Sequence, residues 1–520
     1  MTDNMLGLTL ERAAMAHAER LALRGDDLDL SYRELLSRAR ALAARFSEAG
    51  VTEDDAVMVK VSNHPLDFVA FLACWMAGGV AVPVHRSSPP GVVDGIQAKA
   101  HCRYSVDLLA DQGSGAELSA LQAPAASADR SEMLRGAALV IFTSGSTGLP
   151  KGVVLTHQAF AGKLAQNQKL LGLTPDDVTL LVLNNSFSFG IWMALLALNH
   201  GGTVVTRAKF SPHQFVDTLI AERVTLAGVV PTMIRATFGS LTPGEVALAQ
   251  QRLRAEGRVR DMVIGGEPLG LDLSVKLRSF IAPASLYDVY GLTETSTSDF
   301  VLTPQAYPAH PATIGLPAPG VRYRITSDSA AECTAECSVE CAVDVAGELQ
   351  LQTAYIMAGY LGDAEITRAA FVDGWFRTGD LASRNAEGFV TIVGRLKELI
   401  VRGGNKITPL EVERALCTCP GVAAAMAVGM PDPVLGQRIH ALLIPKAGQA
   451  LAADAIRAGL ASSLEKFKHP DACYVGTELP TGRTGKLDRG QLQAMLPSGA
   501  MSPLAGWTKP PPAHLDSEPT

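Results

Sequence analysis

The feature that most constrains this chain is a loop of glycines and hydroxyl side chains between two apolar strands. Residues 137–142 and residues 153–155 form apolar runs that predict buried strands. Between them lie Thr143, Ser144, Gly145, Ser146, Thr147, Gly148, Leu149, Pro150 and Lys151. Glycines let backbone N–H groups turn toward a ligand, and the hydroxyls and the lysine add donors and charge. The stretch therefore predicts a polyphosphate-binding loop rather than a flexible linker. It is not a Walker loop, because Lys151 precedes Gly152 and is not followed by Ser or Thr.

Helix and strand patterns alternate along most of the chain. Ser31 and Glu34 form a capping box before an amphipathic helix that is expected to end near Gly50. A strand at 56–61, a helix at 65–77 and a strand at 80–82 are expected to follow. This alternation predicts an α/β fold with largely parallel sheets. Residues 111–133 are rich in Ala, Ser and Gln, and a surface loop is expected there.

Polar and glycine-rich segments follow four of the expected strands. These segments begin at Asn184, Pro231, Gly265 and Tyr290. In α/β sheets, residues just past the carboxyl ends of the strands line the ligand crevice. We therefore expect the four segments to converge on one site.

A locally basic segment indicates a domain boundary. Its cations are Arg395, Lys397, Arg402 and Lys406. In an acidic chain such a cluster indicates a surface that faces phosphates. We place the boundary at Lys397, so that residues 1–396 form an N-terminal domain and residues 397–496 a small α+β domain. Residues 497–520 are rich in Pro, Ser and Ala and are expected to be disordered.

Composition excludes several classes of protein. The net charge of −7 and the pI of about 5.9 argue against a nucleic-acid binder. The longest uncharged run, residues 68–84, contains Gly78, Gly79 and Pro83, and it predicts a helix, a turn and a strand rather than a membrane span. No basic region precedes an apolar core at the start of the chain, so a cytoplasmic protein with reduced thiols is expected.

Three cysteines recur at helical spacing. Cys333, Cys337 and Cys341 are each preceded by Glu in an insertion that lies just before a strand. A metal site is the alternative to reduced thiols here, and the position of the insertion disfavours it.

The loop at 143–151 resembles the signature of the adenylate-forming superfamily, which includes acyl- and aryl-CoA synthetases, adenylation domains of nonribosomal peptide synthetases, and luciferases. Further motifs of this superfamily occur in its order over roughly residues 8–496. They are Gly265-Gly-Glu267, Tyr290-Gly-Leu-Thr-Glu294, Arg377-Thr-Gly-Asp380, Gly394-Arg395, Gly403-Gly404 and Gly485-Lys486. The resemblance implies a large N-terminal domain of stacked, helix-covered sheets, a hinge, and a small mobile α+β C-terminal domain.

The resemblance also implies a chemistry that uses ATP and Mg²⁺. Attack of a carboxylate on the α-phosphate gives an acyl-AMP and pyrophosphate, and cations stabilise the charge that develops. Lys486 is implied to bridge the carboxylate and the α-phosphate, Glu294 to bind Mg²⁺, and Thr293 to lie at the α-phosphate. Residues implied to hold the β- and γ-phosphates are Thr143, Ser144, Thr147 and Lys151, with Gly145, Ser146 and Gly148 in the same loop. Residues implied to line the adenosine site are Gly266, Glu267, Asp288, Tyr290, Gly291, Asp380 and Arg395.

In the second half-reaction of this superfamily, the C-terminal domain rotates about a hinge, which corresponds to Lys397 here. Gly403 and Gly404 then line a tunnel for a pantetheine thiol. Many relatives carry Asp at the hinge, and Lys is an accepted variant. The chain length and Gly403-Gly-Asn-Lys406 are similar to a CoA ligase, whereas Gly485-Lys-Leu-Asp-Arg489 is similar to a peptide-synthetase adenylation domain. Coenzyme A is the expected acceptor, and a free-standing acyl or peptidyl carrier protein is the alternative.

Two departures from the family pattern bear on the acid. Phe187 occupies a position where CoA ligases often have His, and Gly190 one where amino-acid-activating domains often have an Asp that binds the α-ammonium. The small carboxylic acid substrate is therefore expected to be aryl or medium aliphatic rather than an α-amino acid. The residues expected to form its pocket are Phe187, Phe189, Gly190, Trp192, Val229, Val230, Gly265 and Gly291. The alternative is that these aromatics belong to the core.

Two functions of other classes are also compatible with the nucleotide motifs. A luciferase-like oxidoreductase would use a second lysine near Val401, and the valine there counts against it. A degenerate nucleotide-binding module is disfavoured by the joint presence of Lys486, Glu294 and Asp380.

Overall fold

The chain forms two compact units in the computed structural model. The model describes residues 5–108, 132–143, 151–327, 340–446, 448–482, 487–498 and 501–507, and the backbone of 117–120. The first unit comprises Met1–Arg324, Gln350–Thr378 and Asn385–Thr391, and the second comprises Ile325–Leu349, Gly379–Arg384 and Ile392–Thr520.

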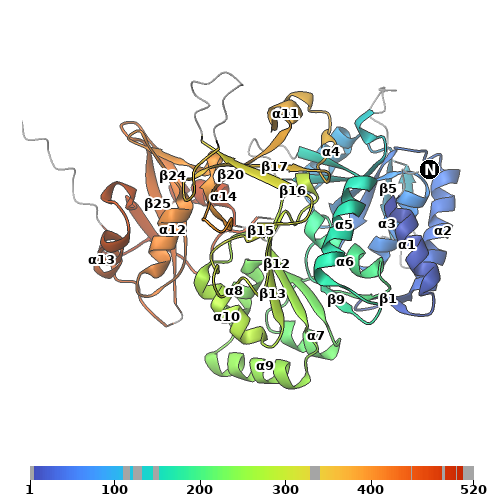
Figure 1. Cartoon of the computed structure of the whole chain (residues 1–520), viewed down its shortest axis with the longest axis horizontal. Helices are drawn as coiled ribbons and strands as arrows, with labels where there is room; N and C mark the ends of the chain where they lie inside the picture. Colours follow the sequence, from blue (N-terminus) through green and yellow to red (C-terminus); the bar gives the residue numbers. More distant parts are fainter. Residues whose placement is uncertain are drawn as a thin grey trace, which may run out of the picture. The chain divides into compact units, whose positions relative to one another are not determined.

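The first unit contains a nine-stranded, mostly parallel sheet (Figure 1). Its strands are β1 (Leu21–Arg24), β2 (Asp29–Ser31), β9 (Val178–Leu181), β10 (Thr203–Thr206), β11 (Leu226–Val229), β12 (Asp261–Gly265), β13 (Ser285–Tyr290), β14 (Phe300–Leu302) and β15 (Leu316–Pro317). Their order is β15-β14-β13-β12-β11-β9-β10-β1-β2. The strands from β13 to β1 run parallel, and antiparallel pairing is confined to the two edges.

A seven-stranded sheet completes the first unit's layers. Its strands are β3 (Ala56–Val61), β4 (Val80–His85), β5 (Tyr104–Asp107), β6 (Glu117–Ala120), β7 (Ala137–Thr143), β8 (Lys151–Thr156) and β18 (Gly359–Tyr360). Their order is β18-β8-β7-β4-β3-β5-β6. Strands β7, β4, β3 and β5 are parallel, whereas β8 returns antiparallel to β7 and pairs with β18.

Helices cover these sheets. They are α1 (Met5–Ala16), α2 (Tyr32–Glu48), α3 (Pro65–Met76), α4 (Pro90–Ala100), α5 (His157–Leu171), α6 (Ser188–Leu198), α7 (Phe215–Ala221), α8 (Pro231–Ser240), α9 (Pro243–Glu256), α10 (Leu271–Ile281) and α11 (Ala364–Ala369). Leu181 and Val204 join one core, and their chain neighbours Leu180 and Val205 join another, as the two-residue period of a strand requires. The first core also holds Leu139 of the seven-stranded sheet, so both sheets share it. Every residue of α6 from Gly190 to Leu198 is buried there.

A smaller sheet crosses the boundary that divides the chain. Its strands are β16 (Val321–Thr326), β17 (Gly347–Thr353), β19 (Phe371–Val372), β20 (Trp375–Arg384) and β21 (Val390–Arg395). Their order is β16-β17-β20-β19, with β21 beside β20. The boundary between the units falls within β16, β17, β20 and β21.

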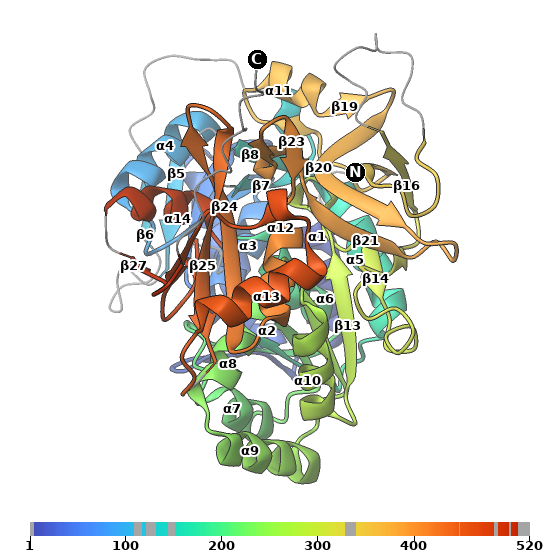
Figure 2. The ribbon, with the colours of Figure 1, turned by 90° about the vertical axis from the view of Figure 1, so that its left-hand side faces the viewer.

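The second unit has a six-stranded sheet with helices on both faces. Its strands are β22 (Ile400–Arg402), β23 (Asn405–Ile407), β24 (Val422–Asp432), β25 (Gly436–Pro445), β26 (Ala472–Val475) and β27 (Ser502–Pro503), and its helices are α12 (Pro409–Thr418), α13 (Ala453–Ser463) and α14 (Arg489–Met495). Alternate residues of β24 join different cores: Ala427 packs with α12 and α13, and Met426 packs with α14. Figure 2 shows α12 and α13 in front of β24 and β25.

The α/β class and the helix-covered sheets are confirmed. The expected capping box at Ser31 and Glu34 forms and begins α2. Two expectations were wrong in part. The segment 111–133 contains β6, which pairs with β5. The chain after Pro497 has structure as far as Trp507, because β27 pairs with β26 and Leu504 is buried; residues 508–520 lie outside the described residues.

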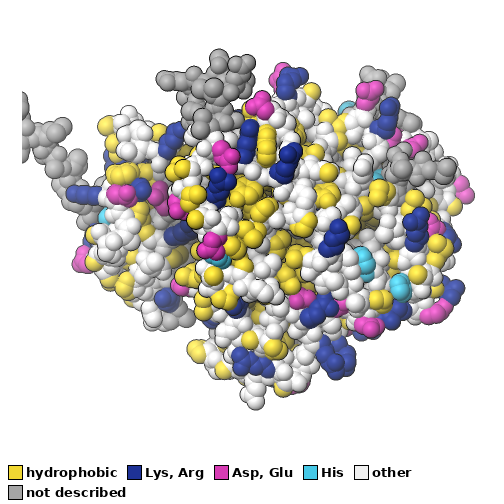
Figure 3. Space-filling view, viewed as in Figure 1, with side chains coloured by type: hydrophobic (Ala, Val, Ile, Leu, Met, Phe, Trp, Pro, Cys, Tyr) yellow, Lys and Arg dark blue, Asp and Glu magenta, His cyan; other side chains and the backbone are white. Residues whose placement is uncertain are grey.

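Charged side chains of both signs are interspersed on the face drawn in Figure 3. Among the described helices, none is long and apolar enough to cross a membrane.

Candidate active site

A short turn after β13 carries the expected metal ligand. Thr293 and Glu294 lie on the 3₁₀ turn η2 (Thr293–Thr295). The Glu294 carboxylate accepts a hydrogen bond at Oε1 from the Tyr360 hydroxyl at 2.8 Å, and its backbone carbonyl accepts one from Met357 N at 2.7 Å. Within the described residues, Oε2 of Glu294 accepts no hydrogen bond. One carboxylate oxygen is thus held in place, and no described residue occupies the other.

Lys151 lies over the Tyr360 ring. Its Nζ is 4.7 Å from the ring centroid, within the range of a cation–π contact. Tyr360 comes from β18, which pairs with β8, and Lys151 is the first residue of β8. Burial and the neighbouring Glu294 raise the pKa of Tyr360, so its hydroxyl remains a donor. The sequence analysis missed Tyr360, which joins two of the expected catalytic residues.

The ends of the phosphate loop are paired. Thr143, the last residue of β7, lies opposite Lys151 in the antiparallel register. The strand pair therefore closes the loop at its base. Ser144, Gly145, Ser146, Thr147 and Gly148, which were expected to hold phosphates, lie outside the described residues.

The Thr293 hydroxyl lies near the beginning of α6. Its Oγ1 is 3.2 Å from Oγ of Ser188, the first residue of that helix. Ser188 is buried, and its hydrogen bond with Thr293 connects the turn η2 to the first residue of α6. Sequence reasoning did not select Ser188.

β13 presents Asp288 and Tyr290, which were expected at the adenosine site. Burial raises the pKa of Asp288 to about 7, against the opposite effect of the Tyr307 hydroxyl, which lies 3.5 Å from Oδ2. The Tyr290 ring meets Phe300 edge-on at a centroid distance of 6.0 Å. A Cβ atom on Gly291 would lie 2.2 Å from Ser298 N, so this position requires glycine.

The end of β12 is equally close-packed. A Cβ atom on Gly265 would lie 2.3 Å from the Val289 carbonyl oxygen, and Gly266 has φ of +92°. The Glu267 side chain is 7% exposed, and its Oε1 accepts from Thr232 N at 2.9 Å and lies 3.4 Å from Arg235 Nη1. Its Oε2 is buried, and no described residue donates to it.

The residues expected to line the acid pocket lie in two environments. Phe187 and Phe189 are half-buried, whereas Trp192, Val229 and Val230 are fully or almost fully buried in the cores. The Phe189 and Trp192 rings stack at 5.5 Å. Their role in binding the acid stays a prediction.

The second unit contains the remaining described candidates. Asp380 is 2% exposed and pairs with Arg395 at 2.8 Å. Gly403 and Gly404 have φ of +56° and +79° at the turn between β22 and β23, and a Cβ atom on Gly404 would meet open space. Lys397 is exposed on η3 (Leu396–Glu398). Lys486, expected to be catalytic, lies outside the described residues.

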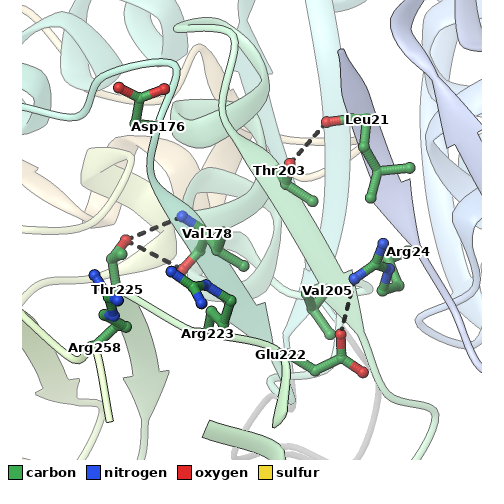
Figure 4. A pocket seen from close by; sticks show the side chains of 10 residues that line it. All are labelled: Leu21, Arg24, Asp176, Val178, Thr203, Val205, Glu222, Arg223, Thr225 and Arg258. Carbon is green, nitrogen blue, oxygen red and sulfur yellow. Dashed lines mark hydrogen bonds and ion pairs between the residues drawn. The ribbon is translucent and has the colours of Figure 1, made fainter. Parts of the chain in front are cut away.

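A cavity of about 390 Å³ lies in the first unit, away from the candidate residues of that unit (Figure 4). Its lining includes Val178 and Thr203, the first residues of β9 and β10, and Thr225, which directly precedes β11. This is the amino-terminal edge of the nine-stranded sheet, whereas Gly265 and Thr293 lie at or beyond the carboxyl ends of β12 and β13. Two of its charged groups, Arg24 and Glu222, pair with each other. The cavity is therefore distinct from the candidate active site.

The expected cysteine cluster has only one described member. Cys341 is a buried free thiol, and Cys333 and Cys337 lie outside the described residues. Where the structure describes the chain, His, Cys, Asp and Glu side chains form no group of three or more that could hold a metal ion.

Comparisons with known proteins agree with this geometry. A family model described as "AMP-binding enzyme" matches residues 10–361, and one described as "AMP-binding enzyme C-terminal domain" matches residues 411–486. A feruloyl-CoA synthase of Amycolatopsis sp is 29% identical over 505 residues, covering 95% of this chain and 99% of the relative. A fatty acid–[acyl-carrier-protein] ligase, ScoC of Streptomyces coeruleorubidus, is 31% identical over 360 residues, covering 68% and 66%. The solved structure of an o-succinylbenzoate CoA synthetase from Bacillus subtilis, in complex with its acyl-adenylate, has a TM-score of 0.76 at 24% identity and covers 93% of this chain and 97% of that one.

Proposed function

Since the chain belongs to the AMP-binding enzyme family, we propose that it activates a carboxylic acid with ATP and transfers the acyl group to the thiol of coenzyme A. A carboxylate oxygen forms a bond to the α-phosphorus, and the bond from that phosphorus to the bridging oxygen breaks, so that pyrophosphate leaves with the electron pair. The thiol sulfur then forms a bond to the acyl carbon, its proton passes to solvent, and AMP leaves. The enzyme is thus an acid–thiol ligase.

The observation that carries this proposal is the convergence of Lys151, Tyr360, Glu294 and Thr293 in the first unit. The Lys151 ammonium provides positive charge for the phosphates, and the Thr293 hydroxyl provides a donor at the strand end. In many enzymes, fixed groups of this kind lower the barrier more than any other effect, because they stabilise the charge that develops in the transition state.

Glu294 fits a magnesium ion. Carboxylate oxygens are the ligands that this hard cation prefers, and Tyr360 holds one oxygen while the other accepts no hydrogen bond from a described residue. Mg²⁺, when bound, would supply a cation that neutralises charge on the phosphate oxygens.

We assign the second half-reaction to the second unit. Gly404 leaves open space at the turn between β22 and β23, which suits the passage of a narrow thiol arm. Lys397 is the proposed hinge, and Lys486 is the proposed lysine of the adenylation step. Asp380, held by Arg395, is proposed to bind the ribose hydroxyls.

The acid is proposed to be neutral apart from its carboxylate, and aryl or medium aliphatic. The half-buried rings of Phe187 and Phe189 support an apolar pocket, and residues 184–192 contain no acidic side chain that could meet an α-ammonium. An ammonium buried in such a pocket would lose several kcal/mol of hydration. The feruloyl-CoA synthase relative acts on an aryl acid by its name, which supports the aryl class.

Loading of a carrier-protein phosphopantetheine is the second candidate, because ScoC is named for that acceptor. The two acceptors differ only in what carries the thiol, so the first half-reaction is the same for both.

Pyrophosphate release over a panel of acids tests the proposal. The panel contains benzoates and cinnamates, medium-chain fatty acids and α-amino acids, each assayed alone, with coenzyme A, and with a phosphopantetheinylated carrier protein. We expect release with an aryl or aliphatic acid and thioester formation with coenzyme A. A Glu294→Gln variant should lose release with every acid. An enzyme that forms no adenylate with any acid would contradict the reaction class, and thioester formed only on the carrier protein would establish the second candidate.

A further inference from the structure

A buried ion pair lies directly behind the turn that carries Glu294. Lys163 of α5 is 1% exposed, and Asp299 is completely buried. Lys163 Nζ donates to Asp299 Oδ1 at 3.0 Å and to the Ser298 carbonyl at 3.1 Å, and it lies 5.1 Å from the centroid of the Tyr355 ring. The lysine thus contacts both the segment that follows Glu294 and the segment that leads to Tyr360.

The other oxygen of Asp299 accepts from the Thr295 hydroxyl, which belongs to the residue directly after Glu294. Thr295 is completely buried, and its Oγ1 also lies 3.1 Å from the Leu292 carbonyl oxygen. Asp299 N donates to the Tyr290 carbonyl at 2.6 Å. The carboxylate of Asp299 therefore connects the buried lysine to the turn that holds Thr293 and Glu294.

The backbone between Thr295 and Asp299 is in an unusual conformation. Ser296, Thr297 and Ser298 have φ of +58°, +66° and +54°, and all three are buried. The left-handed region is unfavourable for non-glycine residues, and they persist there only where the surroundings hold them. Backbone hydrogen bonds from Ser296 and Thr297 help to hold this stretch. Lys163 also donates to the Ser298 carbonyl, and the Ser296 hydroxyl donates to the Tyr355 carbonyl at 2.9 Å.

From these contacts we propose that Lys163 and Asp299 are positioning residues for adenylation, which hold Thr293 and Glu294 where the nucleotide and its cation bind. The inference rests on the proposed function. The pair reaches Glu294 by two routes, through Asp299 and Thr295 on one side and through the Tyr355–Tyr360 segment on the other. Both side chains are buried, so their effect on adenylation would pass through this turn.

The physics of buried ion pairs separates this role from simple stability. The loss of one partner leaves a buried charge and is strongly destabilising, whereas neutral replacement of both partners is often tolerated. If the pair serves only stability, a variant that lacks both charges should fold and keep its activity. If the pair positions the turn, the same variant should fold but lose activity, because the hydrogen bonds to the turn are gone.

The test is the double variant Lys163→Met with Asp299→Asn, in the full-length enzyme. We expect it to fold with a melting temperature near that of the wild type, while kcat for pyrophosphate release falls about 10- to 100-fold and the Mg²⁺ concentration for half-maximal rate rises, as is typical when groups that orient a metal ligand are removed. The KM for the carboxylic acid should change little. The single variant Lys163→Arg keeps the charge, and its kcat should lie between those of the double variant and the wild type.

Asp177→Asn is the matched control. Asp177 is 4% exposed and pairs with Arg260 at 2.9 Å, at the amino-terminal edge of the same sheet. The Asp177→Asn substitution should lower the stability of the protein and leave the Mg²⁺ dependence of pyrophosphate release unchanged. If the folded double variant shows wild-type Mg²⁺ dependence and kcat, or if Asp177→Asn shifts both as much, the positioning role is refuted. If the wild type forms no adenylate at all, the proposed function fails instead.

Discussion

Removal of a single hydroxyl, in Tyr360→Phe, tests how Glu294 is oriented. The Tyr360 hydroxyl donates to Glu294 Oε1 at 2.8 Å, and the ring is 6% exposed. The phenylalanine ring would keep its packing and its contact with Lys151 Nζ. The substitution therefore removes the hydrogen bond and leaves the other contacts in place.

A hydrogen bond to a charged acceptor contributes about 1.5 to 3 kcal/mol. At 1.4 kcal/mol per factor of ten, its loss would weaken Mg²⁺-dependent adenylation by about 10- to 150-fold if the orientation of Glu294 is fully expressed in the transition state. The effect should appear as a lower kcat and a higher Mg²⁺ requirement in pyrophosphate release. The KM for the acid should be unaffected, because the acid does not contact this hydroxyl in the proposed arrangement.

Tyr323→Phe is the control for the loss of a tyrosine hydroxyl. Tyr323 donates to the Gly388 carbonyl at 3.2 Å, a neutral acceptor outside the candidate site. Its loss should cost about 1 kcal/mol of stability and leave the Mg²⁺ titration unchanged. Unchanged kcat and Mg²⁺ dependence in Tyr360→Phe would refute the reasoning. Tighter Mg²⁺ binding would show that the hydroxyl competes with the cation instead of orienting its ligand.

Three other substitutions test further parts of the site. Lys486→Ala should lose pyrophosphate release but still convert synthetic acyl-AMP to thioester; an equal loss of both would show that the lysine is misassigned. Gly404→Leu should spare pyrophosphate release and block thioester formation, and the reverse result in a folded variant would place this turn at the ATP site. The raised pKa of Asp288, from 3.8 to about 7, means that the folded state binds its proton more tightly than the unfolded state, so this group lowers stability as pH rises from about 4 to 7. In Asp288→Asn, the free energy of unfolding measured with urea should decline less across that pH range than in the wild type. An equal decline in both proteins would contradict the raised pKa of Asp288.

Local patterns predicted the parts of the fold that local interactions determine. The strand β3 begins and ends at the expected residues, and the expected capping box of Ser31 and Glu34 begins α2. The convergence of four strand ends was predictable because parallel strands bring their carboxyl ends to one edge of a sheet. In this chain β9, β11, β12 and β13 do so.

The residues that connect these elements were not predictable in the same way. Tyr360 meets Glu294 across 66 residues of chain, and its two-residue strand has no periodicity of its own. Lys163 occupies a helix position that composition assigns to the surface, because lysine is almost never fully buried unless it is paired. Its partner lies 136 residues away. β6 and β27 were missed for the same reason, since each depends on pairing with a strand that is already in place.

Gly190 illustrates how packing can imitate a specificity signal. A Cβ atom there would lie 2.6 Å from the Asn184 carbonyl oxygen, so the packing of the first turn of α6 against the preceding segment requires glycine whatever the acid is. The absence of Asp at this position is therefore weaker evidence against α-amino acids than the sequence alone indicates. An α-amino acid would then need a different carboxylate of the protein to pair with its ammonium group.

Asp299 and Glu267 are the two candidates near the strand ends, and their contacts separate them. Both oxygens of Asp299 are engaged, by Lys163 and by Thr295, and its side chain is completely buried. Glu267 keeps a buried Oε2 that accepts from no described residue, and such an oxygen is costly unless a ligand donates to it. Glu267→Gln should therefore leave the KM for a neutral aryl or aliphatic acid nearly unchanged, since that acid brings no cation to this oxygen. A change in the KM for ATP would report instead on the adenosine role expected of Glu267. An α-amino acid that the wild type activates and that Glu267→Gln rejects would overturn the neutral-acid assignment and make Glu267 the ammonium-binding group.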